Sequence, residues 1–372
     1  MNKTSRIAII GAGVAGIALA ILATKQGYQV SLYERDSEIS VIGAGVTLWP
    51  NAVFVLQQMG LAKELKRFGG EPVCMRQFDL DGVWQGELNI ADVNTLSGAS
   101  SVTILRRDLM SILGGALDDL GVEIHFDCPM TEQAIDGLKQ AFDLVVGADG
   151  RMNSVVRQYL YDGKVSPCYH RFINIIGISQ LEVGVLDNTI QDYRGRGERF
   201  GIVPVKAGLC FWAGAWNSYI DKELPLSAWY DEMHRRFLNW PDPVQSVLKS
   251  YDKTSLRRIF VHDLDPLPYW HKDNVLMIGD AAHASLPTSG QGACQALEDA
   301  WHLVRFLVEQ DELDKALTVF YQRRIAKTSA AQTVGRQLAQ RIFGDHSEPQ
   351  SPVSGISVEQ LSRFWMQGLN VE

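Results

Sequence analysis

The chain has 372 residues, of which 46% are hydrophobic and 21% are charged. These values are typical of a globular protein that folds as one large domain or as two interleaved domains around a buried core. The formal net charge is −8, and this surplus of negative charge disfavours binding to a nucleic-acid backbone or to an anionic membrane. We therefore expect no nucleic-acid partner and no membrane partner.

The cysteines are scattered and never spaced as CxxC; they stand at Cys74, Cys128, Cys168, Cys210 and Cys294. This pattern argues against a disulfide framework and a zinc site, and it favours a reducing compartment. The histidines also lack the spacing of metal ligands, so we expect no metal. The apolar run from Ile7 to Ala23 contains glycines that fit a folded strand–helix unit better than a signal peptide, so we expect a cytoplasmic protein.

The N-terminus predicts a strand–turn–helix unit, with an apolar strand over Arg6–Ile10 and a helix over Ile17–Lys25. A second strand, Gln29–Tyr33, ends at Glu34. The turn has GxGxxG spacing, with Gly11, Gly13 and Gly16. In such a unit the glycines permit the turn, the approach of a pyrophosphate and close helix packing, while the acidic residue binds a ribose. The motif predicts a dinucleotide site but does not distinguish NAD from FAD.

Two further strands end in motifs that suit a flavin. An apolar strand over Asp143–Val146 leads to Asp149. A later apolar strand runs into Asp280, and a glycine-rich turn at Gly290–Gly292 then opens a long helix at about Ala293. A carboxylate beside free backbone N–H groups at a strand end can hold a polyol and a polar ring edge. Together with the N-terminal unit, these sites indicate a bound flavin.

With these motifs in this order, the chain resembles the single-component FAD-dependent aromatic hydroxylases, the para-hydroxybenzoate hydroxylase class, over most of its length. The segments Gly43–Asn51 and Arg106–Leu109 are most similar to urate, 6-hydroxynicotinate and salicylate hydroxylases, and more distantly to tetracycline-inactivating monooxygenases. The resemblance implies an α/β fold. Its parts are a Rossmann-like FAD-binding domain of the GR2 type, an inserted antiparallel β-sheet substrate domain and a long C-terminal helix.

The expected domains are both discontinuous. The FAD-binding domain comprises residues 1–70, 104–164 and 266–345, and the substrate domain comprises residues 71–103 and 165–265. Within the substrate domain we expect a β-hairpin over residues 200–216 and helical structure over residues 229–248 around a Trp-Pro break. A long amphipathic helix is expected over Leu313–Gly344. Residues 346–372 are expected to form a polar linker and a small docking helix.

The resemblance assigns FAD contacts to residues from several parts of the chain. In chain order, they are Gly11, Gly13, Ala15, Gly16, Glu34, Arg35, Gly45, Arg106, Asp149, Asp280, Gly290, Gln291, Gly292 and Ala293. It implies that Glu34 binds the adenosine ribose, that Asp280 binds the ribityl hydroxyls, and that the turn at Gly290–Gly292 holds the pyrimidine edge of the flavin. For Arg106 a surface ion pair is a serious alternative. For Asp149 the family motif implies handling of both the cofactor and the pyridine nucleotide.

The resemblance also suggests residues for catalysis and for the substrate pocket. Pro287 belongs to the loop expected beside the flavin edge, and Arg199 falls where urate hydroxylases carry a substrate-contacting arginine. A solvated hairpin arginine is an equal alternative for Arg199. Cys210 stands where that subgroup has a tyrosine, which puts urate itself in doubt. The expected pocket walls are Thr47, Tyr193, Cys210 and Trp212, although core packing explains Tyr193 and Trp212 equally well.

Only one dinucleotide fingerprint is present, so NADPH or NADH is expected to bind transiently as the reductant. The resemblance implies an NAD(P)H- and O2-dependent monooxygenase that hydroxylates a small aromatic or heteroaromatic substrate through a flavin C4a-hydroperoxide, as a monomer or homodimer. The main alternative is a FAD oxidoreductase on the same fold that inserts no oxygen. A third class is a flavin-binding protein without catalysis, and the intact segment from Gly279 to Gly292 argues against it.

Overall fold

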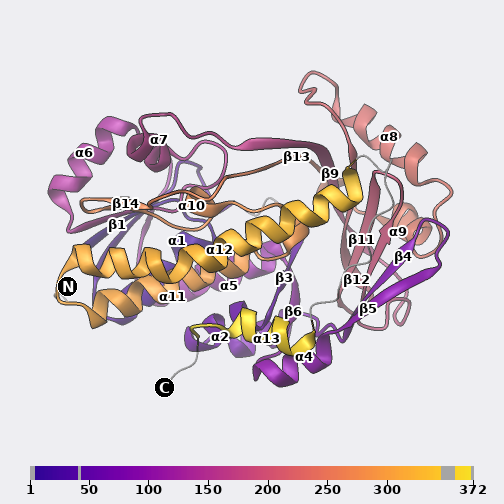
Figure 1. Cartoon of the computed structure of the whole chain (residues 1–372), viewed down its shortest axis with the longest axis horizontal. Coiled ribbons are helices and arrows are strands. Elements are labelled where there is room, and N and C mark those ends of the chain that lie inside the picture. The colour runs from indigo at the N-terminus through magenta and orange to yellow at the C-terminus, as the bar shows by residue number, and fades with distance from the viewer. Residues whose placement is uncertain (1–4, 41–42, 345–356, 370–372) are drawn as a thin grey trace.

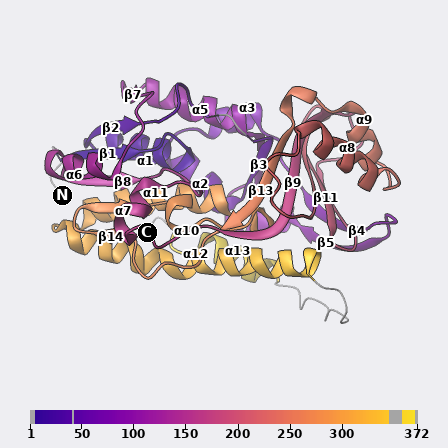
Figure 2. The same cartoon turned by 90° about the horizontal axis from the view of Figure 1, so that it is seen from above.

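The computed structural model describes residues 5–40, 43–344 and 357–369. Two parts lie side by side, each built on its own β-sheet (Figure 1). The long helix α12 (Leu313–Phe343) runs across both parts, and a view turned by 90° shows the same arrangement (Figure 2). This confirms the expected α/β fold with a long C-terminal helix.

The first part is organised by a six-stranded sheet in the order β14-β15-β8-β1-β2-β7. Its strands are β1 (Arg6–Ile10), β2 (Gln29–Tyr33), β7 (Ile124–His125), β8 (Leu144–Gly147), β14 (His271–Lys272) and β15 (Val275–Met277). All neighbours are parallel except β14 and β15, which are antiparallel. The central strands are apolar and buried, as expected for a parallel sheet covered on both faces by helices.

Helices surround this sheet, and several of them pack on one another. They are α1 (Val14–Lys25), α2 (Pro50–Gln58), α3 (Ala62–Phe68), α5 (Arg106–Asp118), α6 (Glu132–Ala141), α7 (Val155–Tyr161), α10 (Asp280–His283) and α11 (Gly292–Glu309). Helix α1 is apolar on every side because it is enclosed, and all ten residues from Val14 to Ala23 are buried. No helix in the described ranges is long and apolar enough to cross a bilayer.

The second part is a seven-stranded sheet in the order β13-β9-β12-β11-β10-β4-β5. Its strands are β4 (Cys74–Asp79), β5 (Trp84–Asn89), β9 (Cys168–Gln180), β10 (Thr189–Arg194), β11 (Glu198–Lys206), β12 (Leu209–Asn217) and β13 (Arg257–Asp263). The sheet is antiparallel except for β10 and β4, which run parallel. Helices α8 (Leu226–Phe237) and α9 (Val244–Ser250) cover one face, and the other face lies against the first part.

A small two-stranded sheet, β3 (Gly45–Leu48) with β6 (Val102–Leu105), connects the two parts. Every strand of the six-stranded sheet falls in segments expected for the FAD-binding domain, and every strand of the seven-stranded sheet falls in segments expected for the substrate domain. The expected boundary between residues 103 and 104 lies inside β6. The proposed domain division is therefore compatible with the sheets, but this boundary belongs at the start of the strand.

Other expected elements differ from the structure only at their ends. The hairpin is β11 and β12, which are longer than expected at both ends. The helical stretch around Trp240 is two helices, α8 and α9, because the chain leaves the helix before Pro241. The expected linker at residues 348–355 lies outside the described residues. The docking helix is α13 (Val358–Met366), which begins with a capping box at Ser357.

Candidate functional site

Four neighbouring strands end at the same edge of the six-stranded sheet. The sheet places β15, β8, β1 and β2 side by side and parallel, so the segments that follow them meet at one edge. These segments begin at Ile278, Ala148, Gly11 and Glu34. Residues that are far apart in sequence are thus brought together, and the order of the strands explains why all three sequence motifs belong to one site.

The three glycines of the first turn are needed for different structural reasons. A Cβ on Gly11, whose φ is +104°, would lie 2.4 Å from the Ala148 carbonyl oxygen. A Cβ on Gly16 would lie 1.9 Å from the Gly11 carbonyl oxygen. A Cβ on Gly13 would meet nothing within 4 Å. Gly11 and Gly16 are therefore required by packing, whereas Gly13 leaves open space in front of the uncapped N-terminus of α1.

Glu34 is bound to this turn by hydrogen bonds. One carboxylate oxygen accepts from the backbone N–H of Ala12 at 2.7 Å, and the other accepts from the N–H of Asp36 at 3.1 Å. The carboxylate therefore lies beside the glycine turn, with lone pairs left for a ligand. Arg35 is exposed and forms a long ion pair with Asp36, at 3.8 Å. Ala15 is buried in α1, where its methyl group lies 3.0 Å from the position that a Cβ on Gly279 would take.

The Asp149 carboxylate is occupied by its own loop. It accepts hydrogen bonds from Oγ of Ser154 at 2.6 Å and from the N–H groups of Val155 and Val156 at 2.6 and 3.2 Å. Burial raises the pKa of Asp149, and these hydrogen bonds oppose that shift. The side chain thus holds the start of α7, and its contribution to a ligand site is through the shape of this loop.

The Asp280 carboxylate, unlike that of Asp149, is not occupied by its own loop. It accepts no hydrogen bond from the described residues, and one oxygen lies 3.9 Å from the position of a Cβ on Gly292. Gly292 and Ala293 open α11, whose N-terminus has no capping side chain and no acidic residue in its first turn. An available carboxylate and unpaired N–H groups therefore face each other. Gly290, which has a φ of +63°, is exposed just before this helix.

Asp299 lies behind this turn and was not found from the sequence. It is fully buried, and it accepts hydrogen bonds from the Gly279 N–H at 2.8 Å, from Nε2 of His283 at 2.5 Å and from Nε of Arg324 at 2.8 Å. Burial alone raises the pKa of Asp299, but the charges of His283 and Arg324 lower it to about 2. Asp299 thus fixes the strand end that carries Asp280. His283 is therefore a structural partner of Asp299.

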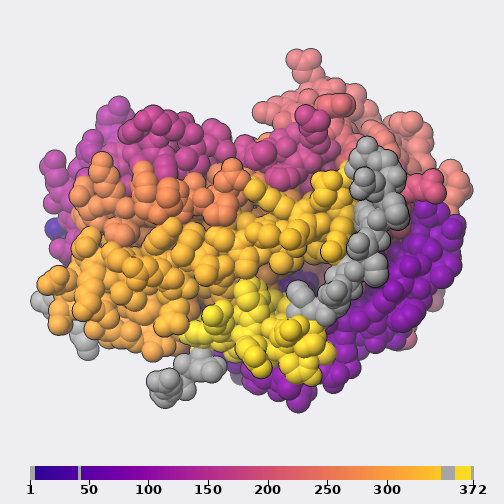
Figure 3. Space-filling model, viewed as in Figure 1, coloured from indigo at the N-terminus to yellow at the C-terminus, as the bar shows by residue number. Residues whose placement is uncertain are grey.

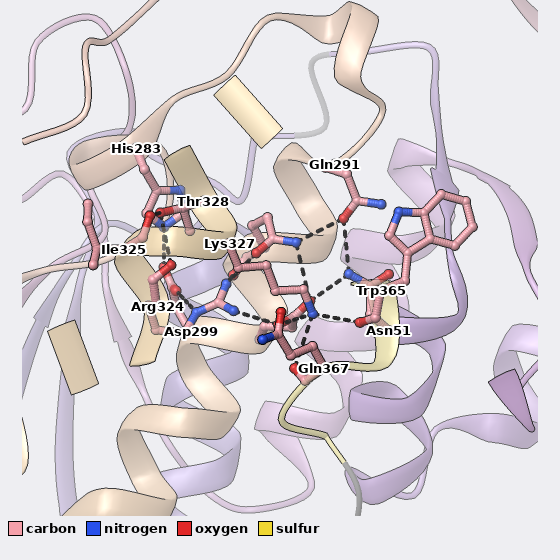
Figure 4. A network of polar contacts seen from close by, with 12 residues as sticks. Asn51, His283, Gln291, Asp299, Arg324, Ile325, Lys327, Thr328, Trp365 and Gln367 are labelled. Atoms are coloured by element: carbon pink, nitrogen blue, oxygen red, sulfur yellow. Dashed lines mark hydrogen bonds and ion pairs between the residues drawn. The ribbon is translucent and has the colours of Figure 1, made fainter. Parts of the chain in front are cut away.

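The Gln291 side chain points into a buried polar network and away from the open turn (Figure 4). Its Oε1 accepts from Asn51 at 3.0 Å and from Gln295 at 2.9 Å. Asn51 also donates to Glu298 at 2.6 Å. No described residue accepts a hydrogen bond from Nε2 of Gln291 or from Nε1 of Trp49. The available contribution of Gln291 to the turn is therefore its backbone.

Arg106 is brought to Asp280. Arg106 is the first residue of α5, and no described residue accepts from its buried Nε. Burial lowers the pKa of Arg106, and the negative charge of Asp280 opposes that shift. A Cβ on Gly43 would lie 2.7 Å from the Arg106 side chain, so the segment before β3 packs directly on it. The surface ion-pair alternative does not describe this residue.

Gly45 and Thr47 lie on β3, at the junction of the two parts. A Cβ on Gly45 would lie 2.2 Å from the ring of Phe211, so the absence of a side chain lets β12 approach. The Thr47 carbonyl accepts from Sγ of Cys294 in the first turn of α11, at 3.8 Å. Both residues are half-buried beside the candidate site.

Arg199 lies on the face of the seven-stranded sheet that is turned toward the first part. Its Nε donates to the buried Asp192 at 2.5 Å, and Arg194 shares that carboxylate through Nη2 at 2.7 Å. The Cα partner of Arg199 is Ala215, which packs against Leu286 in one apolar cluster. Pro287 follows, exposed, at the start of the short 3-10 helix η2 (Pro287–Ser289). Pro287 is therefore next in sequence to Leu286, which packs in the same cluster as the Cα partner of Arg199.

The structure does not bring Tyr193, Cys210 and Trp212 to this site. All three are buried on the opposite face of the sheet, in the cluster that α8 and α9 cover. The side chains of a strand alternate between faces, so the residues that face the first part of the molecule are one position away. They were missed by sequence reasoning and are Gly201, Val203, Phe211 and Ala213. Phe211, in contact with Gly45, shows which face this is.

Comparisons with known proteins agree with this geometry. The family model described as FAD binding domain matches residues 4–175 and 249–330. A FAD-dependent urate hydroxylase of Mycolicibacterium vanbaalenii is 28% identical over 343 residues, 87% of this chain and 85% of the relative. An aurachin C monooxygenase/isomerase of Stigmatella aurantiaca is 28% identical over 340 residues, 88% of this chain and 87% of the relative.

Among solved structures, Klebsiella pneumoniae HpxO complexed with FAD and uric acid has a TM-score of 0.81 with 22% sequence identity. The match covers 92% of this chain and 90% of that one. At this identity the likeness concerns the fold. Within the described residues, no group of three His, Cys, Asp or Glu side chains is placed to hold a metal ion.

Proposed function

The chain belongs to the FAD binding domain family and is a FAD-dependent monooxygenase of the aromatic hydroxylase type, and from this premise we propose which residues hold the cofactor and the substrate. The observation that carries the proposal is the placement of Asp280 opposite the uncapped N-terminus of α11, at the edge where β1, β2, β8 and β15 end. The substrate is proposed to be a small aromatic or heteroaromatic molecule, with O2 and NAD(P)H as co-substrates.

The residues at this edge fit FAD. The open space at Gly13 and the N-terminus of α1 suit a pyrophosphate, and the position of Glu34 suits the adenosine ribose, with Arg35 flanking the adenine. Asp280 is free to accept from ribityl hydroxyls. The backbone of residues 290–293 would hold the pyrimidine edge of the flavin ring. Gly11, Ala15 and Gly16 shape the turn, and Arg106 places a positive charge beside Asp280.

When bound, FAD supplies the redox chemistry that takes electrons from NAD(P)H and inserts one atom of O2 into the substrate. The protein has to hold the substrate ring beside the flavin and exclude water. We assign the exclusion of water to the flavin-side face of the seven-stranded sheet, with Val203, Phe211 and Ala213 as apolar walls opposite Thr47. The turn at Pro287 would close the space from the other side. Arg199 would orient the substrate.

The test is NADH and NADPH consumption by the purified, FAD-loaded protein across phenols, heteroaromatic acids, purines and quinolones, with mass spectrometry of the products. A product one oxygen atom heavier, formed with stimulated NAD(P)H oxidation, supports the proposal and identifies the reductant. Turnover of the nicotinamide with an oxidised or reduced product that contains no new oxygen would instead establish an oxidoreductase that inserts none.

The remaining parts of the proposal concern assembly and location. We propose a monomer or homodimer, because the residues that we assign to the cofactor and the substrate all come from one chain. Light scattering of the purified protein during size-exclusion chromatography would measure the mass directly. A cytoplasmic location remains our proposal, and fractionation of cells that express the tagged chain would test it.

A further inference from the structure

The C-terminal helix α13 lies against helices from both parts of the molecule. It packs beside α2 of the first part and α4 (Ile90–Ser97), which follows the sheet edge of the second part (Figure 1). Oγ of Ser362 and Oγ of Ser97 are hydrogen-bonded at 2.8 Å. In the space-filling view, α13 and α12 form neighbouring yellow surfaces on one face of the molecule (Figure 3).

The first contact between α13 and the proposed flavin turn is an aromatic stack. The rings of Trp365 and Trp49 are 4.6 Å apart, with an angle of 28° between their planes, and both side chains are buried. Nε1 of Trp49 lies 3.1 Å from the position of a Cβ on Gly290. Trp49 is thus packed between α13 and the turn. An aromatic pair of this geometry stabilises the position of both rings beyond the area that they bury.

The second contact is a buried lysine at the C-terminal end of α13. Nζ of Lys327 donates to the carbonyl of Trp365 at 2.6 Å and pairs with Glu298 at 2.8 Å. A positive charge at a helix C-terminus is favoured by the helix dipole. Burial lowers the pKa of Lys327, while the Glu298 carboxylate opposes that shift. The ammonium group therefore depends on partners from both α11 and α13.

Glu298 continues this contact to the turn. It accepts from Asn51 at 2.6 Å, and Asn51 donates in turn to Oε1 of Gln291 at 3.0 Å (Figure 4). The side chains along this route, from Lys327 to Gln291, are all buried. Buried polar groups of this kind are held in one arrangement, because leaving any one of them unpaired is unfavourable.

We propose that α13 is part of the cofactor site, with Trp365 and Lys327 as positioning residues that hold Trp49 and the Gly290–Ala293 turn in the conformation that binds FAD. This inference rests on the proposed function, because the contact of the turn with the flavin ring is itself part of that proposal. Nε1 of Trp49, a buried donor without a partner in the described structure, lies beside Gly290 at this turn. A ring edge that carries acceptors is the chemical class of group that satisfies such a donor.

The experiment measures the release of FAD from the diluted holoprotein by flavin fluorescence, in the wild type, Trp365→Ala and Trp365→Phe. We expect Trp365→Ala to weaken FAD retention by about tenfold, the effect of one lost aromatic stack and its buried surface. Trp365→Phe keeps an aromatic ring at this position, so we expect it to retain FAD nearly as well as the wild type. The matched control is Trp301→Ala, because Trp301 packs edge-on against Phe54 of α2 and, among the ring contacts of the described residues, is not stacked on Trp49.

A second variant keeps the inference testable if Trp365→Ala does not fold. Lys327→Met removes the charge and the hydrogen bond to the Trp365 carbonyl at similar volume, and we expect it to weaken FAD retention in the same direction. Wild-type retention in both variants, or an equal loss in Trp301→Ala, would overturn the inference while leaving the proposed function intact. A wild-type chain that retains no FAD would instead contradict the proposed function, and this inference with it.

Discussion

The buried carboxylate of Asp192 accepts a hydrogen bond from Nε of Arg199 at 2.5 Å. The guanidinium of Arg199 is thus held through its Nε. The Cα partner of Arg199 on the neighbouring strand is Arg194, and like charges placed directly opposite each other destabilise a sheet. Asp192 pairs with both. Burial by itself raises the pKa of Asp192, but the two arginine charges lower it below its usual range. The cluster therefore carries a net positive charge.

We predict that Arg199→Gln raises KM for an anionic substrate by about 10- to 100-fold, which corresponds to the loss of one charge-assisted hydrogen bond. The two Nη groups of Arg199 donate to no described residue, and the side chain is 27% exposed, so this edge is available to a ligand. The fold should persist because Arg194 still pairs with Asp192. Steady-state kinetics with a matched pair of carboxylate and carboxamide substrates would measure the effect.

The control for this prediction is Arg194→Gln, which leaves the hydrogen bond between Arg199 and Asp192 in place. We expect its KM to stay near that of the wild type. If Arg199→Gln changes KM equally for the charged and the neutral substrate, the side chain does not recognise an anion.

A second prediction separates the two aspartates of the site. Asp280→Ala should weaken FAD retention or abolish turnover with little change in melting temperature, because no described residue donates a hydrogen bond to this carboxylate. Asp149→Ala should instead lower the melting temperature, because it removes the acceptor of Oγ of the N-cap residue Ser154 and of the Val155 and Val156 N–H groups, a loss of about 1 to 3 kcal/mol. Flavin content and thermal unfolding of both purified variants would test this. Wild-type flavin content in Asp280→Ala would contradict the proposed site.

The elements that carry the site could be predicted because their signals are local. The turn at Gly11, the strand end at Asp280 and helix α12 each depend on residues that are close in sequence. The expected helix over residues 313–344 differs from α12 by one residue. The expected membership of the aromatic hydroxylase class is confirmed by the family match over residues 4–175 and 249–330.

The residues of the substrate pocket were predicted less well. Adjacent residues of a strand face opposite sides of the sheet, so an error of one position assigns a side chain to the wrong face. Trp212 and its neighbour Phe211 are both large and apolar, so composition alone does not say which of them faces the flavin domain. The role of Asp299 was also not predictable, since Arg324 and the Gly279 N–H are its partners only after α11 and α12 pack together. The same holds for Lys327 and the carbonyl of Trp365, which are joined by tertiary structure alone.

A third prediction tests the assignment of sheet faces directly. Ala213→Leu places a larger side chain on the flavin-side face and should change KM or kcat with a small effect on the melting temperature. Cys210→Ala, three residues away on the face covered by α8 and α9, should leave KM unchanged and lower stability by about 1 kcal/mol, because it opens a small cavity in a closed core. Kinetics and thermal unfolding of this pair give the answer. The reverse pattern would mean that the substrate binds on the helix-covered face.

The fourth prediction concerns pH and the buried His302 in α11. Neither ring nitrogen of His302 has a partner among the described residues, and its ring lies 3.3 Å from the position of a Cβ on Gly368, just after α13. Burial, together with the charges of Arg324 and Lys327, lowers the pKa of His302 to about 2. The unfolded chain binds this proton at a pKa of about 6.5. Stability is therefore fully present above that pH and is lost as the pH falls below it.

Between pH 6.5 and pH 5 this loss amounts to about 2 kcal/mol at most, since each unit of difference in pKa corresponds to about 1.4 kcal/mol. We predict that the melting temperature of the wild type falls by several degrees more between pH 7 and pH 5 than that of His302→Leu. The variant should retain part of the fall, because burial also lowers the pKa of His262 and His271. Thermal unfolding at the two pH values measures the difference. Parallel curves for the two proteins would show that His302 takes up its proton in the folded state, which requires that α13 does not shield it from solvent.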